Sequence, residues 1–196
     1  MLKRLKNPIF AAKVILVMVV CVLAVWALRH GDYFRLMTVA ITFVLVFLCD
    51  IVRKVRAGWR VTTYMELVYL TFMFVAMVLG IDLELYEKVP YLDKVVHTAS
   101  GVLTAGFAVY ILRYFGLEKS NNHFRGLFIV VFSMGVAAGW ELFEFACDQM
   151  AGTRMQNLVS EGVGDTMFDL LAATVGAVVT AYYIERKRRR GQRKVL

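Results

Sequence analysis

Residues 9–28 read I-F-A-A-K-V-I-L-V-M-V-V-C-V-L-A-V-W-A-L, an apolar run of 20 residues that contains a single charge, Lys13. As a helix, this run would rise about 30 Å, which is the thickness of the hydrocarbon core of a bilayer. Five further apolar runs of similar length follow it along the chain. The six predicted spans are Ile9–Leu28, Phe34–Val52, Tyr64–Ile81, Val95–Phe115, Gly126–Cys147 and Asp165–Ile184.

The composition of the whole chain agrees with these runs. Of the 196 residues, 60% belong to the set AVILMFWYC, and the mean hydropathy is +0.64. Disordered proteins are far less hydrophobic, and soluble domains are about 45–50% apolar by a similar count. The runs are too uniformly apolar to be the alternating strands of a membrane barrel. The sequence therefore predicts an all-α, polytopic membrane protein with about six transmembrane helices in a single membrane domain, residues 1–196.

The distribution of charge predicts the topology. The net charge is +8, and with six spans both chain ends lie on one side of the membrane. That side carries 17 of the 23 Lys and Arg residues, and the other side carries five. The positive-inside rule then places both termini in the cytoplasm. The basic tail, residues 185–196, is expected to meet anionic lipid, and no nucleic-acid partner is expected.

Ionisable side chains inside or beside a span are costly and usually functional. Three of the predicted spans carry such side chains in pairs, separated by one helical turn. The pairs are Asp93 with His97, Glu141 with Glu144, and Asp165 with Asp169. These spacings put both members of a pair on one helix face. The predicted topology puts all three pairs at the outer end of their helices.

Small residues lie along the same three spans at a spacing of four, and they let membrane helices approach closely. They are Gly101 with Ala105, Gly135 with Gly139, and Ala172 with Gly176. We therefore predict that the helices within residues 95–184 pack as a close trio around a polar cleft that opens outward. The helices within residues 9–81 would surround this trio as a jacket.

Five carboxylates and one imidazole would converge in this cleft. In a low dielectric they cannot all remain charged, so either some carboxyls bind protons or a cation sits among them. Such ligands suit Mg, Mn, Fe or Zn, and they resemble the di-metal sites of helix bundles. The predicted metal ligands are His97, Glu141, Glu144, Asp165 and Asp169. Asp93 is predicted to orient His97, and Glu141 or Glu144 to act as a general base.

Structural roles offer an alternative for several of these residues. Asp93 and Asp165 stand where a helix N-cap belongs, so capping alone would explain them. Glu141 could form a structural ion pair with Lys94 or Arg154.

The order of the motifs resembles a known family. Asp-Lys-x-x-His at 93–97, Trp-Glu-x-x-Glu at 140–144 and Asp-Thr-x-x-Asp at 165–169, followed by Gly176, look like the YjdF-type bacterial inner-membrane proteins over roughly the last 110 residues. This resemblance implies a multi-span bacterial membrane protein and little specific chemistry. A more distant similarity is to VanZ-like proteins, some of which are associated with glycopeptide resistance. The chain departs from that pattern, because Ala172 and Ala173 stand where an Asn is expected.

These patterns favour a divalent-metal-dependent protein that acts on a lipid or lipid-linked substrate at the outer leaflet, for example as a hydrolase. One alternative is a small cation or proton transporter that uses the carboxylates as a relay. The predicted spans four to six carry no acid deeper in the membrane than Asp169, so a polar path through to the inner side is not indicated. Another alternative is a non-catalytic membrane scaffold in which the acidic cluster is structural.

Overall fold

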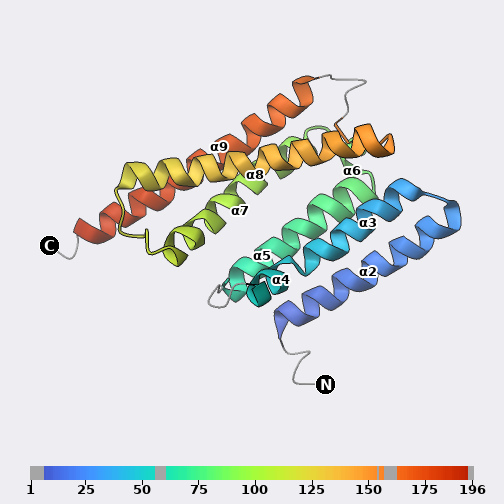
Figure 1. Cartoon of the computed structure of the whole chain (residues 1–196), viewed down its shortest axis with the longest axis horizontal. Helices are drawn as coiled ribbons and strands as arrows, with labels where there is room; N and C mark the ends of the chain where they lie inside the picture. The colour runs from blue at the N-terminus through green and yellow to red at the C-terminus, as the bar shows by residue number, and fades with distance from the viewer. Residues whose placement is uncertain (1–6, 56–60, 154, 157–162, 194–196) are drawn as a thin grey trace. The chain divides into compact units, whose positions relative to one another are not determined.

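A computed structural model of the chain describes residues 7–55, 61–153, 155–156 and 163–193 (Figure 1). These residues form helices joined by short connections, and none of them forms a strand. The elements are α2 (Pro8–His30), α3 (Tyr33–Val46), α4 (Leu48–Val55), α5 (Thr63–Met73), the π-helix η1 (Phe74–Asp82), α6 (Leu85–Lys88), α7 (Leu92–Tyr114), α8 (Asn122–Ala151) and α9 (Val163–Arg193). The predicted all-α class is confirmed.

The described residues contain five helices that are long and apolar enough to cross a membrane. A sixth span results if α3 and α4 are counted together as one span that is broken by a bend of 47°. The number of predicted spans therefore agrees with the structure. The placement of both termini in the cytoplasm stays a prediction.

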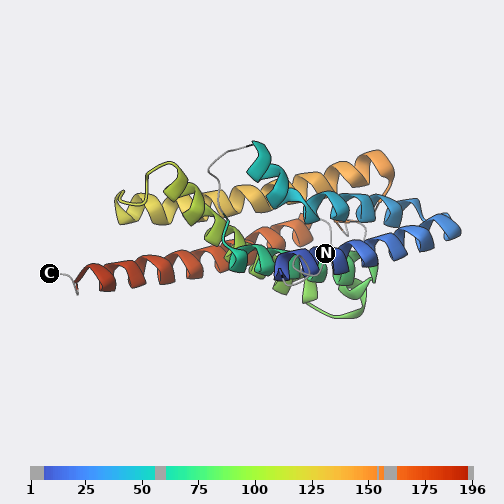
Figure 2. The same cartoon turned by 90° about the horizontal axis from the view of Figure 1, so that it is seen from below.

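The chain divides into two compact units, Met1–Leu92 and Asp93–Leu196. The first contains α2 to α6, and the second contains α7 to α9, as the colours of Figures 1 and 2 allow the reader to follow. The division falls between the two predicted groups of helices, residues 9–81 and 95–184. A jacket of the first group around the second stays a prediction, as does the assignment of both to a single membrane domain.

The predicted second span is broken at Phe47, and the break has a local cause. The Phe47 amide turns back to the Val44 carbonyl at 3.1 Å, which ends α3. The Tyr69 hydroxyl, from α5, donates to the carbonyl of Leu45 at 2.8 Å. A side chain that inserts into the hydrogen-bond ladder is a known cause of kinks in helices. The bend reorients α4 relative to α3, and α4 carries charged side chains that reach α2 and α5.

Four charged side chains meet inside the first unit. Lys13 Nζ lies 2.5 Å from Asp50 Oδ2 and 2.6 Å from Glu66 Oε1. Arg53 contacts Asp50 Oδ1 and Glu66 Oε2, each at 2.7 Å. The Glu66 side chain is 0% exposed, so it depends on its two partners for the polar contacts that water would otherwise supply. Two cations and two anions therefore form a balanced quartet that joins α2, α4 and α5.

In the second unit, the backbones of α7 and α9 touch. A Cβ atom on Gly101 would lie 1.9 Å from the carbonyl oxygen of Ala173, and one on Gly176 would lie 2.2 Å from that of Thr98. These distances are far below any van der Waals contact, so each position requires glycine. The predicted close approach is confirmed for these two helices.

For α8 the close packing is also present, against α9, but it does not run through the two predicted glycines. Nothing in the described part of the chain lies within 4 Å of a Cβ atom placed on Gly135 or Gly139. The buried positions of α8 include Ser133, Ala137 and Glu141, which recur every four residues. Both glycines are offset from these positions by two residues, or about 200° around the helix, and are exposed. They therefore lie on the outer face of α8.

The start of the predicted basic tail continues α9, which runs without interruption to Arg193. Glu185 is buried against α8, where Arg125 Nε donates to its Oε1 atom at 3.0 Å. Arg188 adds a hydrogen bond of 2.7 Å to Asn122. The last helix is thus tied to the beginning of α8 at this end of the bundle.

The quartet of the first unit can be tested with Glu66→Gln. This change leaves two cations beside one anion in a buried position, and we expect it to lower the free energy of unfolding by about 3–5 kcal/mol. Glu87→Gln, at an exposed position on α6, serves as the control and should change it by less than about 0.5 kcal/mol. Chemical denaturation of both variants in the same detergent measures the difference, and equal stability would contradict the buried pairing.

The contact between α7 and α9 can be tested with Gly101→Ala. The new methyl group would force the two backbones apart, so we expect a loss of about 1–3 kcal/mol in the free energy of unfolding. Gly135→Ala is the matched control, because it also lies inside a helix and has open space around it. It should be neutral or stabilising by up to about 1 kcal/mol. Thermal melting followed by circular dichroism should show a lower melting temperature for Gly101→Ala and an unchanged or higher one for Gly135→Ala. An equal loss in both variants would refute the close contact at Gly101.

Candidate functional site

The first turns of α7, the second half of α8 and the first turns of α9 bring charged side chains together. The group comes from positions that are up to 76 residues apart in sequence, and it consists of Asp93, Lys94, His97, Glu141, Asp165 and Asp169. The close backbone contact between α7 and α9 lies directly beside it, at Thr98 and Gly101. Short side chains such as aspartate can therefore reach across from one helix to the other.

His97 stands at the centre of this group. Its Nε2 atom lies 3.6 Å from Asp93 Oδ1 and 3.8 Å from Asp169 Oδ1. The same nitrogen lies 3.9 Å from Glu141 Oε1. These distances are longer than hydrogen bonds. Three carboxylate oxygens, one from each helix, therefore surround one imidazole nitrogen without bonding to it directly.

Two of these oxygens, Glu141 Oε1 and Asp169 Oδ1, accept no hydrogen bond within the described residues, and of the two only Asp169 Oδ1 has an ion-pair contact with Lys94, at 2.8 Å. Glu141 Oε1 is buried and accepts no hydrogen bond there. The side chain of Glu141 is only 6% exposed, so water has little access to it. An unsatisfied buried acceptor is costly, and in a native structure it calls for an explanation such as a bound ion.

The spacing of the ligand atoms suits a metal ion. One oxygen each of Asp93 and Asp169 and one ring nitrogen of His97 lie within 4.8 Å of one another. A first-row divalent metal binds such atoms at about 2.0–2.2 Å, which separates neighbouring tetrahedral ligands by about 3.4 Å. The observed separations from His97 Nε2 are a few tenths of an ångström larger. Small side-chain movements would close the group around one ion.

Lys94 also belongs to this group, although the sequence indicates for it only a structural ion pair with Glu141. The structure pairs it elsewhere. Lys94 Nζ lies 3.2 Å from Asp93 Oδ2 and 2.8 Å from Asp169 Oδ1, and it also donates to Asp165. Arg154, the other partner considered for Glu141, lies outside the described residues.

The charges of the group do not balance. Asp93, Glu141, Asp165 and Asp169 bring four carboxylates, and Lys94 brings one ammonium group. If all of them are ionised and His97 is neutral, three negative charges remain in a mostly buried volume. A divalent cation would reduce this excess to one.

Asp93 and Asp165 lie differently from what the sequence suggested. Asp93 faces the Nε2 atom of His97, as Asp169 does. It is therefore placed to bind the same metal ion as His97. Asp165 contacts Lys94 and lies outside the group of possible ligand atoms among the described residues. Its link to the centre runs through Lys94, which also holds Asp169.

Glu144 also lies outside that group. Its Oε1 atom accepts a hydrogen bond of 2.7 Å from Trp140 Nε1, one turn back along α8. Its separation from Glu141 by three residues predicts that both lie on one helix face. The structure shows that the two side chains have different surroundings, because Glu141 turns toward His97 and Glu144 is held by the indole ring.

The connection after α8 folds back beside Glu141. Asp148 accepts hydrogen bonds from the amides of Met155 at 2.8 Å and Gln156 at 3.0 Å. This positions the buried Gln156, whose Nε2 atom donates to the Glu141 carbonyl and to the Thr166 hydroxyl, both at 3.2 Å. Gln156 and Thr166 are thus part of the wall of the site. The sequence pattern does not indicate this role, because Gln156 lies in a connection between helices and Thr166 is simply the residue after Asp165.

Comparison with known proteins places the chain among membrane proteins. A family model described as "Predicted membrane protein (DUF2238)" matches residues 11–190, a range that includes every residue of the site. A protein of Thermotoga maritima, described as uncharacterized, is 29% identical to the chain over 120 residues. The match covers 59% of the chain and 59% of that relative's length. No solved structure matches the chain.

The role of Lys94 can be tested with Lys94→Met. The substitution removes the cation that Asp93, Asp165 and Asp169 share, so we expect the free energy of unfolding to fall by about 3–5 kcal/mol. Lys88→Met is the control, since the Lys88 side chain is 60% exposed and its ion pair with Glu84 contributes less than about 1 kcal/mol. Denaturation in detergent compares the two variants. Similar stability for both would show that Lys94 does not neutralise the buried acids.

Proposed function

The chain belongs to the DUF2238 family of membrane proteins, and on that premise we propose that it binds a divalent metal ion inside its helical bundle. The ligands of the proposed centre are His97, Asp93, Asp169 and Glu141. The observation that carries this proposal is the buried Glu141 Oε1 atom, which has no hydrogen-bond partner among the described residues and faces His97 Nε2 together with the two aspartates.

Charge and ligand chemistry support the same proposal. The excess of buried carboxylates over the single ammonium group of Lys94 favours a bound cation, because unpaired charge in a low dielectric is strongly unfavourable. One imidazole with several carboxylates is a donor set that suits Mn, Fe or Zn, and carboxylates alone would also suit Mg. Lys94 holds Asp169 in place and is itself paired with Asp165, as hydrogen-bonded neighbours of metal ligands commonly are.

We further propose that the centre acts on a lipid or a lipid-linked substrate. Residues next to the site in sequence present large apolar side chains at the surface of the bundle, where a lipid could approach from the side. Their exposed fractions range from 47% to 68%, and they are Val95, Leu142, Phe145, Met167 and Phe168. A bound divalent metal would supply polarisation of a phosphoryl or carbonyl group and activation of water, which makes hydrolysis the favoured reaction.

Glu144 is the general base of this proposal. It lies one turn beyond Glu141 on α8, is held by Trp140, and does not belong to the group of ligand atoms. A carboxylate that is positioned near a metal centre without binding the metal can accept the proton of an attacking water. The distribution of basic residues supports a location of this site at the outer leaflet of a bacterial cytoplasmic membrane, with both termini inside.

The packing below the site argues against a transport path. The hydroxyls of Ser133 and Thr180 donate to carbonyls of their own helices, at 2.9 Å and 2.8 Å. Beyond them the three helices close around an apolar core of buried residues. These are Ala105, Ala108, Leu112, Ile129 and Ala181, each at most 5% exposed. This closed packing therefore favours a binding site over a cation or proton transporter.

Metal binding by the purified full-length protein tests the proposal. We expect about one Mn²⁺ or Zn²⁺ per chain by elemental analysis after dialysis against each metal. Asp169→Asn and His97→Gln should weaken binding at least tenfold in a titration, because each removes a ligand atom. Glu144→Gln is the matched control on the same cluster and should bind the metal with unchanged affinity.

Two outcomes would overturn the metal centre. One is that the wild-type protein binds neither ion, and the other is that the ligand variants bind as tightly as Glu144→Gln does. If the acidic group only stabilises the fold, Asp169→Asn should lower the melting temperature, and added metal should leave the melting temperature of the wild type unchanged. For a metal centre, added metal raises the melting temperature of the wild type and not that of Asp169→Asn.

A further inference from the structure

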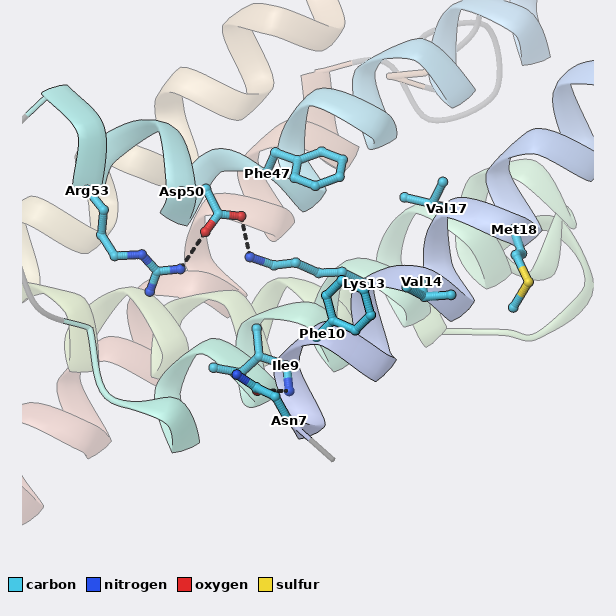
Figure 3. Close-up of a pocket in the computed structure, with 10 residues that line it drawn as sticks. All are labelled: Asn7, Ile9, Phe10, Lys13, Val14, Val17, Met18, Phe47, Asp50 and Arg53. Atoms are coloured by element: carbon cyan, nitrogen blue, oxygen red, sulfur yellow. Dashed lines mark hydrogen bonds and ion pairs between the residues drawn. The ribbon is translucent and has the colours of Figure 1, made fainter. Parts of the chain in front are cut away.

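A groove in the first unit shares no residue with the proposed metal centre. It has a volume of about 630 Å³ and runs along α2 beside the break between α3 and α4. Its lining residues are Asn7, Ile9, Phe10, Lys13, Val14, Val17, Met18, Phe47, Asp50 and Arg53, which Figure 3 shows as sticks. Ligand sites commonly have this size and combine an apolar wall with a few polar groups.

The apolar wall has the length of one membrane leaflet. From Ile9 to Met18, α2 rises about 14 Å. One leaflet contributes about 15 Å to the hydrocarbon core of a bilayer. The wall is built from aliphatic and aromatic side chains with Phe47 across from them, and Phe10 and Met18 are 39% and 56% exposed. A single acyl chain that lies along α2 fits this wall.

The polar part of the groove offers a donor and an acceptor side by side. Arg53 Nη2 and Asp50 Oδ1 lie 2.7 Å apart, and Figure 3 shows Asp50 between Arg53 and Lys13. The two side chains at this point are partly open, with exposed fractions of 33% for Arg53 and 38% for Asp50. Their contacts with protein use three of the five N–H groups of Arg53 and leave lone pairs on Asp50.

We propose that this groove binds one phospholipid with a phosphoethanolamine headgroup. The phosphate would accept hydrogen bonds from Arg53, the primary ammonium group would donate to Asp50, and one acyl chain would lie against Val14, Val17 and Met18. The pairing of opposite charges on neighbouring side chains matches the pairing of opposite charges in this headgroup.

The electrical balance of the quartet selects this class of lipid. Lys13 and Arg53 are neutralised by Asp50 and Glu66, so the groove carries no net positive charge that would favour an anionic lipid. A choline headgroup has the phosphate but no N–H group to donate to Asp50. Phosphatidylglycerol has no cation for Asp50 at all. Phosphatidylethanolamine alone among these three supplies both partners.

Native mass spectrometry of the full-length protein in detergent tests this proposal. The protein is mixed with equal amounts of the dioleoyl forms of phosphatidylethanolamine, phosphatidylcholine and phosphatidylglycerol. We expect one bound phosphatidylethanolamine per chain, with an affinity about tenfold above that for phosphatidylcholine, the effect of one charge-assisted hydrogen bond. Equal binding of the three lipids, or binding of none, would overturn the proposal.

Two substitutions on α2 locate the binding. Val17→Trp fills the groove and should reduce phosphatidylethanolamine binding at least tenfold. Val22→Trp adds the same side chain at a position that is 68% exposed and does not line the groove, so it should bind lipid like the wild type. Melting temperatures show whether both variants fold, and Val14→Phe replaces Val17→Trp if the latter does not. Undiminished binding by a folded groove variant would place the lipid elsewhere and refute the proposal.

Discussion

A charge inside a helical bundle in a membrane is tolerated only when another group neutralises it, and both units of this protein are organised by that constraint. In the first unit, Lys13, Asp50, Arg53 and Glu66 satisfy one another, and the fully buried Glu66 receives hydrogen bonds from both cations. The result is a balanced group that joins three helices. The second unit uses the same principle but stops short of balance, because four carboxylates surround a single ammonium group.

The imbalance is made possible by the close contact of α7 with α9. Because Gly101 and Gly176 let the backbones touch, His97 on α7 comes within 3.8 Å of Asp169 on α9. Glu141 approaches the same imidazole nitrogen from α8, and Lys94 neutralises the aspartates on the other side. One ammonium group cannot compensate four carboxylates, and this excess of negative charge is what supports the proposed cation site.

Most residues of the proposed metal centre could be predicted from the sequence, but the side chains that each of them contacts could not. Helical spacing and topology brought Asp93, His97, Glu141 and Asp169 to one level, because residues one turn apart share a helix face whatever the tertiary structure. The choice between neighbours depends on how each helix is rotated. Glu144 is bound by Trp140 rather than directed at His97, and Gly135 lies on the outer face of α8, since a rotation of the helix separates residues that look equivalent in a pattern.

By itself, the sequence determined the all-α class, the number of spans and the helices that carry the acids, because these follow from the length and polarity of local segments. Only the tertiary structure decided which charges meet. Tyr69 binds the carbonyl of Leu45 at the break between α3 and α4, and α4 places Asp50 and Arg53 against side chains of α2 and α5. That contact joins residues 24 positions apart, and no periodic pattern records it. Pairing of buried charges depends on distances of a few ångströms between helices, and these distances are set by bends and backbone contacts that involve the whole bundle.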